Sequence, residues 1–456
     1  MTNRHPSSAR EVALQVLVKV DRDLAYSNLL LHQAIAGQNL ARIDAALVTE
    51  LVYGTIQRQN TLDFYLSRFL RQGADKLELW VRVLLRLSLF QILYLDRIPP
   101  HAAVNEAVNI AKSRGHRGVA GLVNGVLRSL LREKSSLRIP QNLPADERLS
   151  LIHSHPLWLI RRWIAQYGMA RTEAICAANN VPPRTSLRAN ALQIKREKLR
   201  EKLTAAGYAA VLSEVSPDGI VVSGGGNPAQ TELFRQGYFS IQDESSMLVA
   251  RAVDPQPGMT VLDCCAAPGG KTTHLAERMR NVGTIWANDL HIHKKQLIEA
   301  QADRLRLSII RATVGDAARL GERFAPHTFD RVLLDAPCSG LGVIRRKPEM
   351  KWRKTDADIE GLTKIQLSLL KAAAPLVKPG GILVYSTCTT VPAENEEMVR
   401  TFLAEAPEFA EDDELPRLMP ADVWNKAGFG AGMLKITPDL WQTDGFFIAR
   451  LRKQTG

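Results

Sequence analysis

The chain has 456 residues, which is enough for two or three domains with separate hydrophobic cores. Its hydrophobic fraction of 45% and charged fraction of 23% are ordinary for a globular protein. The N-terminal residues are polar and basic with no apolar run behind them, which is not the pattern of a secretion signal. The most apolar stretch, residues 77–95, carries Arg82 and Arg86 and therefore favours a core helix over a membrane span. We expect a cytoplasmic protein with no membrane partner.

The net charge of +12 indicates a polyanionic partner. Residues 1–140 hold 19 Lys and Arg against 11 Asp and Glu, so most of the excess lies in the N-terminal third. The five cysteines include the adjacent pair Cys264 and Cys265 and form no Cys-x-x-Cys motif. This pattern favours a reducing compartment and predicts neither a disulfide framework nor a metal site.

The N-terminal part of the chain has the pattern of a helical domain. Apolar residues recur at helical spacing from about residue 8 to residue 134, and a proline-containing linker follows at 135–145. Helical patterns continue over about 149–180, and then strand-like runs at 184–188 and 220–222 flank a helix at 195–207. We therefore predict a helical domain at 1–140 and a small α+β subdomain at 141–236, in which Arg184, Arg188 and Asn190 are weak candidates for facing RNA.

From residue 237 onward, strands alternate with helices. The pattern predicts a doubly wound, mostly parallel α/β sheet over 237–456, whose ligands bind at the carboxyl ends of the strands. The predicted strands are 238–242, 260–263, 283–288, 309–314, 331–335, 381–386 and 445–450.

A strand, a glycine-containing turn and a helix start follow one another in residues 260–277. Free backbone N–H groups converge at such a turn, which predicts a site for an anionic or nucleoside ligand. The Gly270-Lys271-Thr272 triplet resembles the end of a phosphate-binding P-loop, but that motif needs a glycine where Cys265 stands. Asp289 lies at the position of an acid that binds ribose hydroxyls, and Asp316 ends the next strand. We favour a nucleoside cofactor without a triphosphate, and S-adenosylmethionine is the best candidate.

Two cysteines and an acid lie at the same predicted edge of the sheet. Asp335-Ala-Pro-Cys338 follows one strand, and Cys388 follows another. A lone cysteine is more often a small buried hydrophobe than a nucleophile, but two of them beside a cofactor loop suggest covalent chemistry.

The motifs CAAPGGKT, LLDAPCSGLGVIRRKPEMKW, YSTCT and DGFF resemble those of bacterial ribosomal RNA cytosine-C5 methyltransferases of the RsmB (Sun/Fmu) type. Residues 97–115 and 121–130 resemble the NusB family of helical RNA-binding domains. The resemblance implies an all-α NusB-like bundle, a small α+β subdomain and a Rossmann-like class I methyltransferase domain. It also implies methylation of carbon 5 of one cytosine in small-subunit (16S) ribosomal RNA.

Roles for individual residues follow from the resemblance. Cys388 is expected to be the nucleophile, Cys338 to assist product release, and Asp335 to contact the base near the cofactor's methyl group. Asp289 is expected to bind the ribose and Asp316 the adenine. The amino-acid moiety of S-adenosylmethionine is expected to contact Cys265, Ala266, Ala267, Pro268, Gly269, Gly270 and Lys271.

A basic run follows Cys338 and includes a tryptophan, Trp352, a composition typical of nucleic-acid contacts. We predict RNA contacts by Arg345, Arg346, Lys347, Lys351 and Arg353, and we expect a monomer that uses no metal. Two alternatives stay open: a transfer RNA cytosine-C5 methyltransferase, and a non-catalytic RNA-binding or assembly factor.

Overall fold

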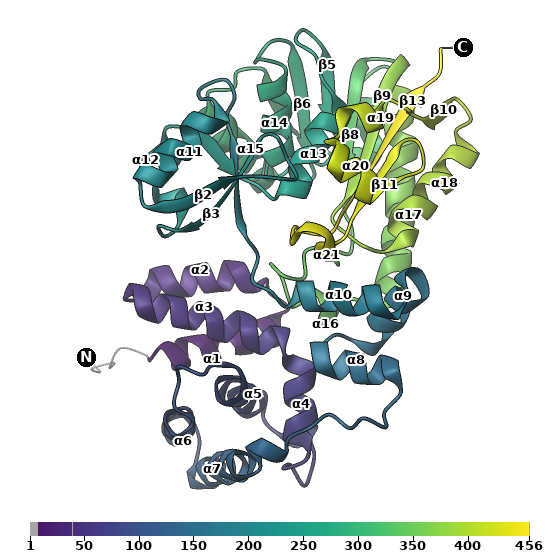
Figure 1. Ribbon diagram of the computed structural model, residues 1–456. Helices are drawn as coiled ribbons and strands as arrows, with labels where there is room; N and C mark the ends of the chain where they lie inside the picture. Colours follow the sequence, from purple (N-terminus) through teal and green to yellow (C-terminus); the bar gives the residue numbers. More distant parts are fainter. Residues whose placement is uncertain (1–7, 39, 456) are drawn as a thin grey trace. The chain divides into compact units, whose positions relative to one another are not determined.

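The computed structural model describes residues 8–38 and 40–455, which form two compact units. Unit 1 comprises Met1–Val181 together with Ile344–Arg353, and unit 2 comprises Pro182–Val343 and Lys354–Gly456. The chain therefore leaves the second unit for ten residues and then returns to it (Figure 1). Within the described residues, no helix is long and apolar enough to cross a membrane.

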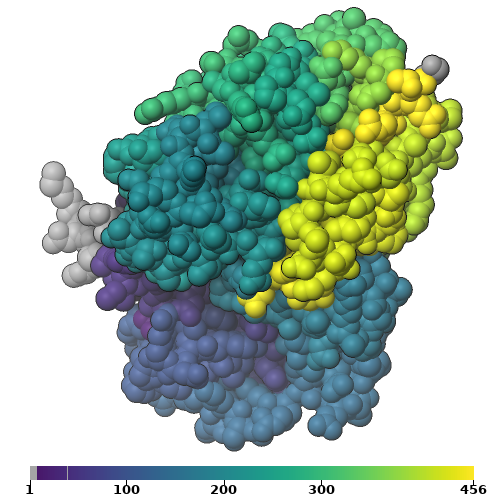
Figure 2. All heavy atoms as spheres, turned by 45° about the horizontal axis from the view of Figure 1, so that its top comes forward, coloured from purple at the N-terminus to yellow at the C-terminus, as the bar shows by residue number. Residues whose placement is uncertain are grey.

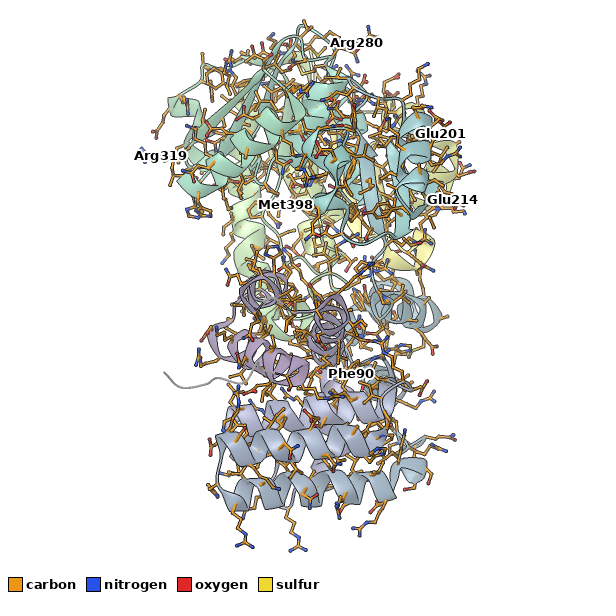
Figure 3. The ribbon with its side chains drawn as sticks, turned by 90° about the vertical axis from the view of Figure 1, so that its left-hand side faces the viewer. Phe90, Glu201, Glu214, Arg280, Arg319 and Met398 are labelled. Carbon is orange, nitrogen blue, oxygen red and sulfur yellow. The ribbon has the colours of Figure 1, made fainter. Side chains whose placement is uncertain are left out.

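Unit 1 is a helical bundle built around α5 (Leu79–Tyr94), the apolar segment predicted to be a core helix. Eleven of its sixteen residues are buried, and Phe90 lies among the stacked helices (Figure 3). A Cβ atom at Gly54 would fall 2.0 Å from the Phe90 ring, so only glycine lets α3 approach α5 this closely. The other helices of the bundle are α1 (Ala9–Asp23), α2 (Ser27–Gln38), α3 (Arg42–Gln57), α4 (Gln59–Ser67), α6 (Pro100–Arg114) and α7 (Arg117–Arg132).

Three further helices belong to the same unit: α8 (Ala145–His153), α9 (Leu157–Tyr167) and α10 (Met169–Asn179). The start of α4 binds α8, where the Thr61 hydroxyl donates to the Leu151 carbonyl oxygen at 2.5 Å. The Asn60 and Thr61 backbone N–H groups both donate to the Ser154 hydroxyl. The sequence pattern predicts residues 141–236 as one subdomain, whereas in the structure α8, α9 and α10 belong to unit 1 and the part of the range from Pro182 onward belongs to unit 2. This difference arises from side-chain contacts that the helical pattern does not specify.

The ten-residue segment 344–353, which ends in α16 (Met350–Arg353), caps three helix ends of unit 1. The Glu349 carboxylate accepts hydrogen bonds from the Ser27 N–H and hydroxyl at the start of α2. Lys351 Nζ and Trp352 Nε1 donate to the last carbonyl groups of α3, and Arg353 donates to three carbonyl groups at the end of α1. A carboxylate at a helix N-terminus and cations at C-termini match the helix dipole and bind otherwise unpaired backbone groups.

Unit 2 begins with an antiparallel sheet in the order β2-β3-β1-β4, with α11 packed against it. Its central strand carries Arg188, which is completely buried and therefore does not face solvent or RNA. The guanidinium donates to Glu277 in α14, at 2.7 Å and 3.1 Å, and to the Gly270 carbonyl oxygen at 2.7 Å. The elements of this subdomain are β1 (Thr185–Ala189), α11 (Arg196–Ala205), β2 (Tyr208–Leu212), β3 (Gly219–Gly224), α12 (Glu232–Arg235) and β4 (Phe239–Ile241).

The rest of unit 2 is a doubly wound sheet in the order β11-β12-β13-β9-β8-β5-β6-β7, with β10 paired to β13. The five strands from β9 to β7 are parallel, and β13 closes the sheet antiparallel to β9. The strands are β5 (Thr260–Asp263), β6 (Thr284–Asp289), β7 (Ile310–Val314), β8 (Phe329–Asp335), β9 (Val377–Thr387), β10 (Phe409–Glu411), β11 (Gly428–Phe429), β12 (Met433–Ile436) and β13 (Phe446–Lys453). The helices are α13 (Glu244–Val253), α14 (Gly270–Arg278), α15 (Ile292–Leu305), α17 (Asp356–Ala373), α18 (Glu396–Glu405), α19 (Leu415–Leu418), α20 (Ala421–Ala427) and α21 (Pro438–Trp441).

Helices cover both faces of this sheet, and successive strand residues feed the two faces in turn. In β8, Leu333 belongs to the apolar cluster under α13 and α14, while Val332 and Leu334 belong to the cluster under α17 and α18. Successive residues of a strand point to opposite faces of the sheet, and here both faces are buried. The strands are therefore apolar at nearly every position, which is the pattern that predicts a parallel sheet. The C-terminal residues, yellow in Figure 2, form a continuous part of the surface of unit 2. Arg280 and Arg319 point outward from the same unit (Figure 3).

We expect Arg188→Met to destabilise unit 2 by about 3–5 kcal/mol, because it leaves the Glu277 carboxylate buried without its main partner. Burial already raises the pKa of Glu277, so in the variant this group should take up a proton near neutral pH. Urea unfolding followed by circular dichroism measures the loss. Arg235→Met is the matched control, because Arg235 pairs with Glu232 at the surface and its removal should change little. Equal stabilities of the two variants would contradict this account of Arg188.

Candidate functional site

The predicted cofactor loop, residues 265–271, connects β5 to α14. Gly269 has a φ of 101°, and a Cβ atom there would lie 3.2 Å from the Ile298 Cα atom, so the turn requires glycine. Arg188 binds the Gly270 carbonyl oxygen and thereby fixes the start of α14. The loop is therefore held by the small sheet as well as by its own strand and helix.

A cavity of ≈ 320 Å³ opens beside this loop, at the carboxyl ends of β5, β6, β7 and β8. Its lining includes Cys265, Ala267, Asp289, Asp316 and Asp335, so five residues of the predicted set meet in one place. The predicted site residues Ala266, Pro268, Gly269, Gly270 and Lys271 lie on the same loop but are not part of the lining.

Two acids of the cavity differ in their surroundings. Asp289 is buried and accepts hydrogen bonds from the Ala267 and Leu290 N–H groups, and it pairs with Lys294 at 3.2 Å. Asp316 is exposed and accepts a hydrogen bond from the Ala318 N–H at 2.9 Å. Each carboxylate has about four acceptor positions, so both retain capacity for the hydroxyl or amino groups of a ligand.

A buried acid, Asp263, lies directly before the loop. It is 1% exposed, and its Oδ2 accepts a hydrogen bond from the Thr272 hydroxyl at 2.7 Å, while its Oδ1 makes no hydrogen bond of normal geometry within the described chain. Burial raises the pKa of Asp263 to about 7, opposed by the Thr272 hydrogen bond and reinforced by the charge of Asp335. A hydrogen bond with the Cys265 backbone also lowers the pKa of Asp263, and Asp263 is not part of the cavity lining.

Asp335 ends β8 and is held from two sides. Its Oδ2 accepts from Lys271 Nζ at 2.7 Å, and its Oδ1 accepts from the Ser386 hydroxyl at 2.7 Å. Burial alone would lower the pKa of Lys271, but the charge and the hydrogen bond of Asp335 outweigh it and raise that pKa. Lys271 therefore remains a cation, and the Cys388 sulfur contributes to the same upward shift.

The two predicted cysteines face each other. Cys388 directly follows β9, Cys338 lies in the loop after β8, and their sulfur atoms are 3.4 Å apart. Both side chains are partly exposed. The hydrogen bond to Cys388, together with burial, raises the pKa of Cys338 well above its usual value. Cys338 therefore keeps its proton at neutral pH, next to the sulfur atom of Cys388.

The remaining cysteines have a different character. Cys264 and Cys176 are buried, and burial raises the pKa of both thiols. Cys265 lines the cavity, but burial and the neighbouring acids raise its pKa strongly as well. Cys265 is partly exposed and lies near Lys294, but the neighbouring acids outweigh that cation, so none of the three thiols has the lowered pKa typical of a reactive thiol. No group of three or more His, Cys, Asp or Glu side chains that would hold a metal ion occurs among the described residues.

The predicted RNA contacts need correction. Lys351 is fully buried, Arg345 is 3% exposed, and Arg353 donates to backbone carbonyl groups, so these side chains serve the structure of unit 1. Basic side chains bind helix-end carbonyl groups as well as phosphates. A run of basic residues in a sequence does not show which of these two partners each side chain binds. Arg346 and Lys347 are partly exposed, and Lys347 Nζ lies 4.9 Å from the centre of the Tyr26 ring.

Known protein families match all three parts of this chain. The sequence model described as 16S rRNA methyltransferase RsmB/F matches residues 250–452, the NusB family model matches 7–132, and the ferredoxin-like domain of RsmF/B-like methyltransferases matches 155–227. The probable ribosomal RNA small subunit methyltransferase B of Bacillus subtilis (strain 168) is 46% identical over 98% of this chain and 99% of its own length. The chain belongs to the RsmB methyltransferase family.

Solved structures agree with this assignment. The crystal structure of PH0851 aligns with 99% of this chain and 100% of its own, at a TM-score of 0.83 and 28% identity. A methyltransferase homolog protein from Pyrococcus horikoshii covers 68% of this chain and 99% of its own, at a TM-score of 0.57 and 29% identity. The predicted fold class, a NusB-like bundle followed by a small subdomain and a Rossmann-like methyltransferase domain, is confirmed.

Several residues that hold the site of this RsmB-family chain are absent from the sequence-based prediction. Asn288 donates to the carbonyl oxygens of Cys264 and Gly315 and so ties the ends of three strands together. Ser386 holds Asp335 and lies opposite it in the register of β8 and β9. Their positions at strand ends were visible in the sequence, but amide and hydroxyl groups are too common there to stand out.

The raised pKa of Asp263 predicts a pH dependence of stability. Between about pH 4 and pH 7 the unfolded chain has lost this proton while the folded chain retains it, so ionisation at higher pH penalises the folded state. We expect Asp263→Asn to become progressively more stable than the wild type as pH rises from 5 to 7, with a constant difference above pH 8. Urea unfolding of both proteins at four pH values measures this. A pH-independent difference would rule out the burial-driven shift.

Proposed function

We propose that this protein methylates carbon 5 of one cytosine in small-subunit (16S) ribosomal RNA, with S-adenosylmethionine as the methyl donor. The observation that carries the proposal is the pair of sulfur atoms 3.4 Å apart beside the acid-lined cavity. The relatives named as small-subunit ribosomal RNA methyltransferases support the choice of RNA. A ribosomal RNA substrate also places the proposed activity in the cytoplasm, and we propose that a monomer carries it out.

The residues around the cavity fit S-adenosylmethionine. Asp289 would bind the ribose hydroxyls, Asp316 the adenine amino group, and the loop 265–271 the amino-acid moiety. The three cavity acids, Asp289, Asp316 and Asp335, suit a ligand that carries a sulfonium and an ammonium group. When bound, this cofactor supplies the methyl group as an electrophile.

Cys388 is proposed as the nucleophile. Carbon 5 of cytosine is too weak a nucleophile to accept an alkyl group by itself, but addition of a thiolate to carbon 6 makes it enamine-like. The thiolate is the reactive form, and two neighbours favour it: the Lys271 cation and the S–H group of Cys338. The target base must leave its stack to reach the sulfur atom, as in other enzymes that act on bases.

Asp335 is proposed to contact the base at its ring nitrogen. The bonds from Lys271 and Ser386 fix both of its oxygen atoms, so the carboxylate needs no reorganisation when the base arrives. A carboxylate there stabilises the positive charge that a protonated ring nitrogen carries in the covalent adduct.

Cys338 is proposed to assist release of the product. Loss of the proton from carbon 5 returns that electron pair to the ring, which restores the double bond and expels the Cys388 sulfur as a thiolate. Once Cys388 is bonded to the base it carries no charge, so the interaction that raises the pKa of Cys338 weakens. The second thiol, which is partly exposed, then loses its proton to solvent more readily, and the resulting thiolate accepts the proton from carbon 5.

The alternatives have less support. A non-catalytic RNA-binding factor has no need for two partly exposed sulfur atoms in contact. A transfer RNA substrate fits the same chemistry, but the relatives that match most of the chain are named for ribosomal RNA.

Cysteine substitutions test the two roles separately. We expect Cys388→Ser to abolish methylation and to form no covalent complex with RNA, because the hydroxyl is far less nucleophilic than a thiolate. Cys338→Ser should instead accumulate enzyme bound to its methylated product, visible as a slow band on a denaturing gel. The reverse pattern would show that the roles are exchanged.

Substitutions in the basic run distinguish side chains that bind RNA from side chains that stabilise unit 1. Lys347→Ala should weaken binding to 16S ribosomal RNA uniformly and lower the slope of log affinity against log salt by about one. Lys351→Met should leave that slope unchanged, because the Lys351 Nζ atom is buried and donates to the Gln57 carbonyl oxygen of its own unit. Filter binding at several salt concentrations measures both. A lower slope for Lys351→Met would restore the wider RNA surface that the sequence predicts.

A further inference from the structure

A buried carboxylate that the proposed chemistry does not use lies behind the two cysteines. Glu394 ends a short turn between β9 and α18, and its side chain is completely buried. Burying a carboxylate costs folding free energy unless hydrogen-bond donors surround its oxygen atoms. The donors that surround it come from both cysteine loops.

Glu394 binds the residue that follows each cysteine. Its Oε1 accepts from the Ser339 N–H at 2.8 Å, and its Oε2 accepts from the hydroxyl groups of Ser339 and of Thr389, the latter at 3.0 Å. The two hydroxyl oxygens are also 2.8 Å from each other. Ser339 follows Cys338 and Thr389 follows Cys388, so one carboxylate connects the two loops immediately beside their sulfur atoms.

We propose that Glu394 is a positioning residue that sets the distance between the Cys338 and Cys388 sulfur atoms. The proposal rests on the proposed function, because it assigns a purpose to that distance. It concerns alignment, since Glu394 binds the neighbours of the cysteines and not the reacting atoms.

Two neighbours hold the carboxylate and its surroundings. Gln366 of α17 donates from one Nε2 atom to Glu394 at 3.1 Å and to the Pro337 carbonyl oxygen at 2.9 Å. Asn395 accepts from the Thr387 hydroxyl and donates to the Thr389 carbonyl oxygen. The loop before Cys338 and the backbone on both sides of Cys388 therefore belong to the same network.

This network explains why two separate loops keep their sulfur atoms in contact. Each cysteine is partly exposed, and the loops that carry them begin at the ends of different strands. A displacement of about 1 Å at a reacting group costs much of its rate, so loops of this kind need a common support. Charge-assisted hydrogen bonds to one buried carboxylate provide it.

The test uses full-length protein and a probe that needs no catalysis. Phenylarsine oxide bonds to two neighbouring thiols and releases water, so its affinity for the Cys338–Cys388 pair reports their spacing. The variants are Ser339→Ala with Thr389→Val, which removes both hydroxyl donors, and Glu394→Gln. Thr389→Ser keeps the hydroxyl, and Glu396→Gln makes the same chemical change in a buried glutamate that pairs with Lys435 instead. Cys338→Ser measures the arsenical affinity of a protein that lacks the Cys338–Cys388 thiol pair.

We expect the double variant and Glu394→Gln to lose at least about tenfold in arsenical affinity and in kcat, the scale of one lost hydrogen bond to a buried charge. Their Kd for S-adenosylmethionine should equal that of the wild type, and Thr389→Ser and Glu396→Gln should behave like the wild type in all three measurements. If thermal unfolding shows that Glu394→Gln does not fold, the double variant decides the outcome.

Unchanged arsenical affinity and kcat in the double variant would overturn the proposal. Its failure is distinguishable from failure of the proposed function. A wild type that neither methylates 16S ribosomal RNA nor forms the covalent complex contradicts the function, while the arsenical measurement still reads the sulfur spacing.

Discussion

The parallel register of β8 and β9 is the constraint on which the candidate site depends. Asp335 pairs with Ser386 in this register, so the acid at the last position of β8 meets the hydroxyl that holds it one residue before the end of β9. Strands β8 and β9 then end at the same edge of the sheet, so the loop that carries Cys338 lies next to Cys388. A slip of two residues, the smallest that keeps the buried faces, would move Asp335 away from its partner and separate the sulfur atoms.

Buried carboxylates perform different tasks in unit 2 because their partners differ. Glu277 pairs with the Arg188 guanidinium and joins the small sheet to α14. Glu394 accepts hydrogen bonds from neutral donors, which are the N–H and hydroxyl groups of the two cysteine loops and the Gln366 amide. Asp263 has one hydroxyl donor, and burial raises its pKa to about 7. The same side-chain chemistry thus gives a structural link, a carboxylate that joins two loops and a group that titrates near neutral pH, according to what surrounds it.

Local sequence patterns were sufficient for much of this molecule. The cofactor loop, the acids at strand ends and the two cysteines were identified because turn chemistry and strand periodicity act over short stretches of chain. Asn288, Glu394 and Arg188 were missed or misread because their roles depend on partners far away in sequence. Arg188, for example, binds a carboxylate 89 residues later, and nothing in its neighbourhood indicates that it is buried.

The basic run after Cys338 also has partners that are far away in sequence and that the local pattern does not indicate. Within segment 344–353, the negative Glu349 lies at a helix start and the positive Arg353 lies at a helix end. These two charges have the sign that the dipole of each helix favours, although the helices belong to the other end of the chain. Burial lowers the pKa of Lys351 well below its ordinary value, so this side chain acts at its helix end as a hydrogen-bond donor. Charges that look like contacts for a nucleic acid instead hold this segment within unit 1, and the hydrogen bonds from Lys351, Trp352 and Arg353 to helix-end carbonyl groups are the physical reason.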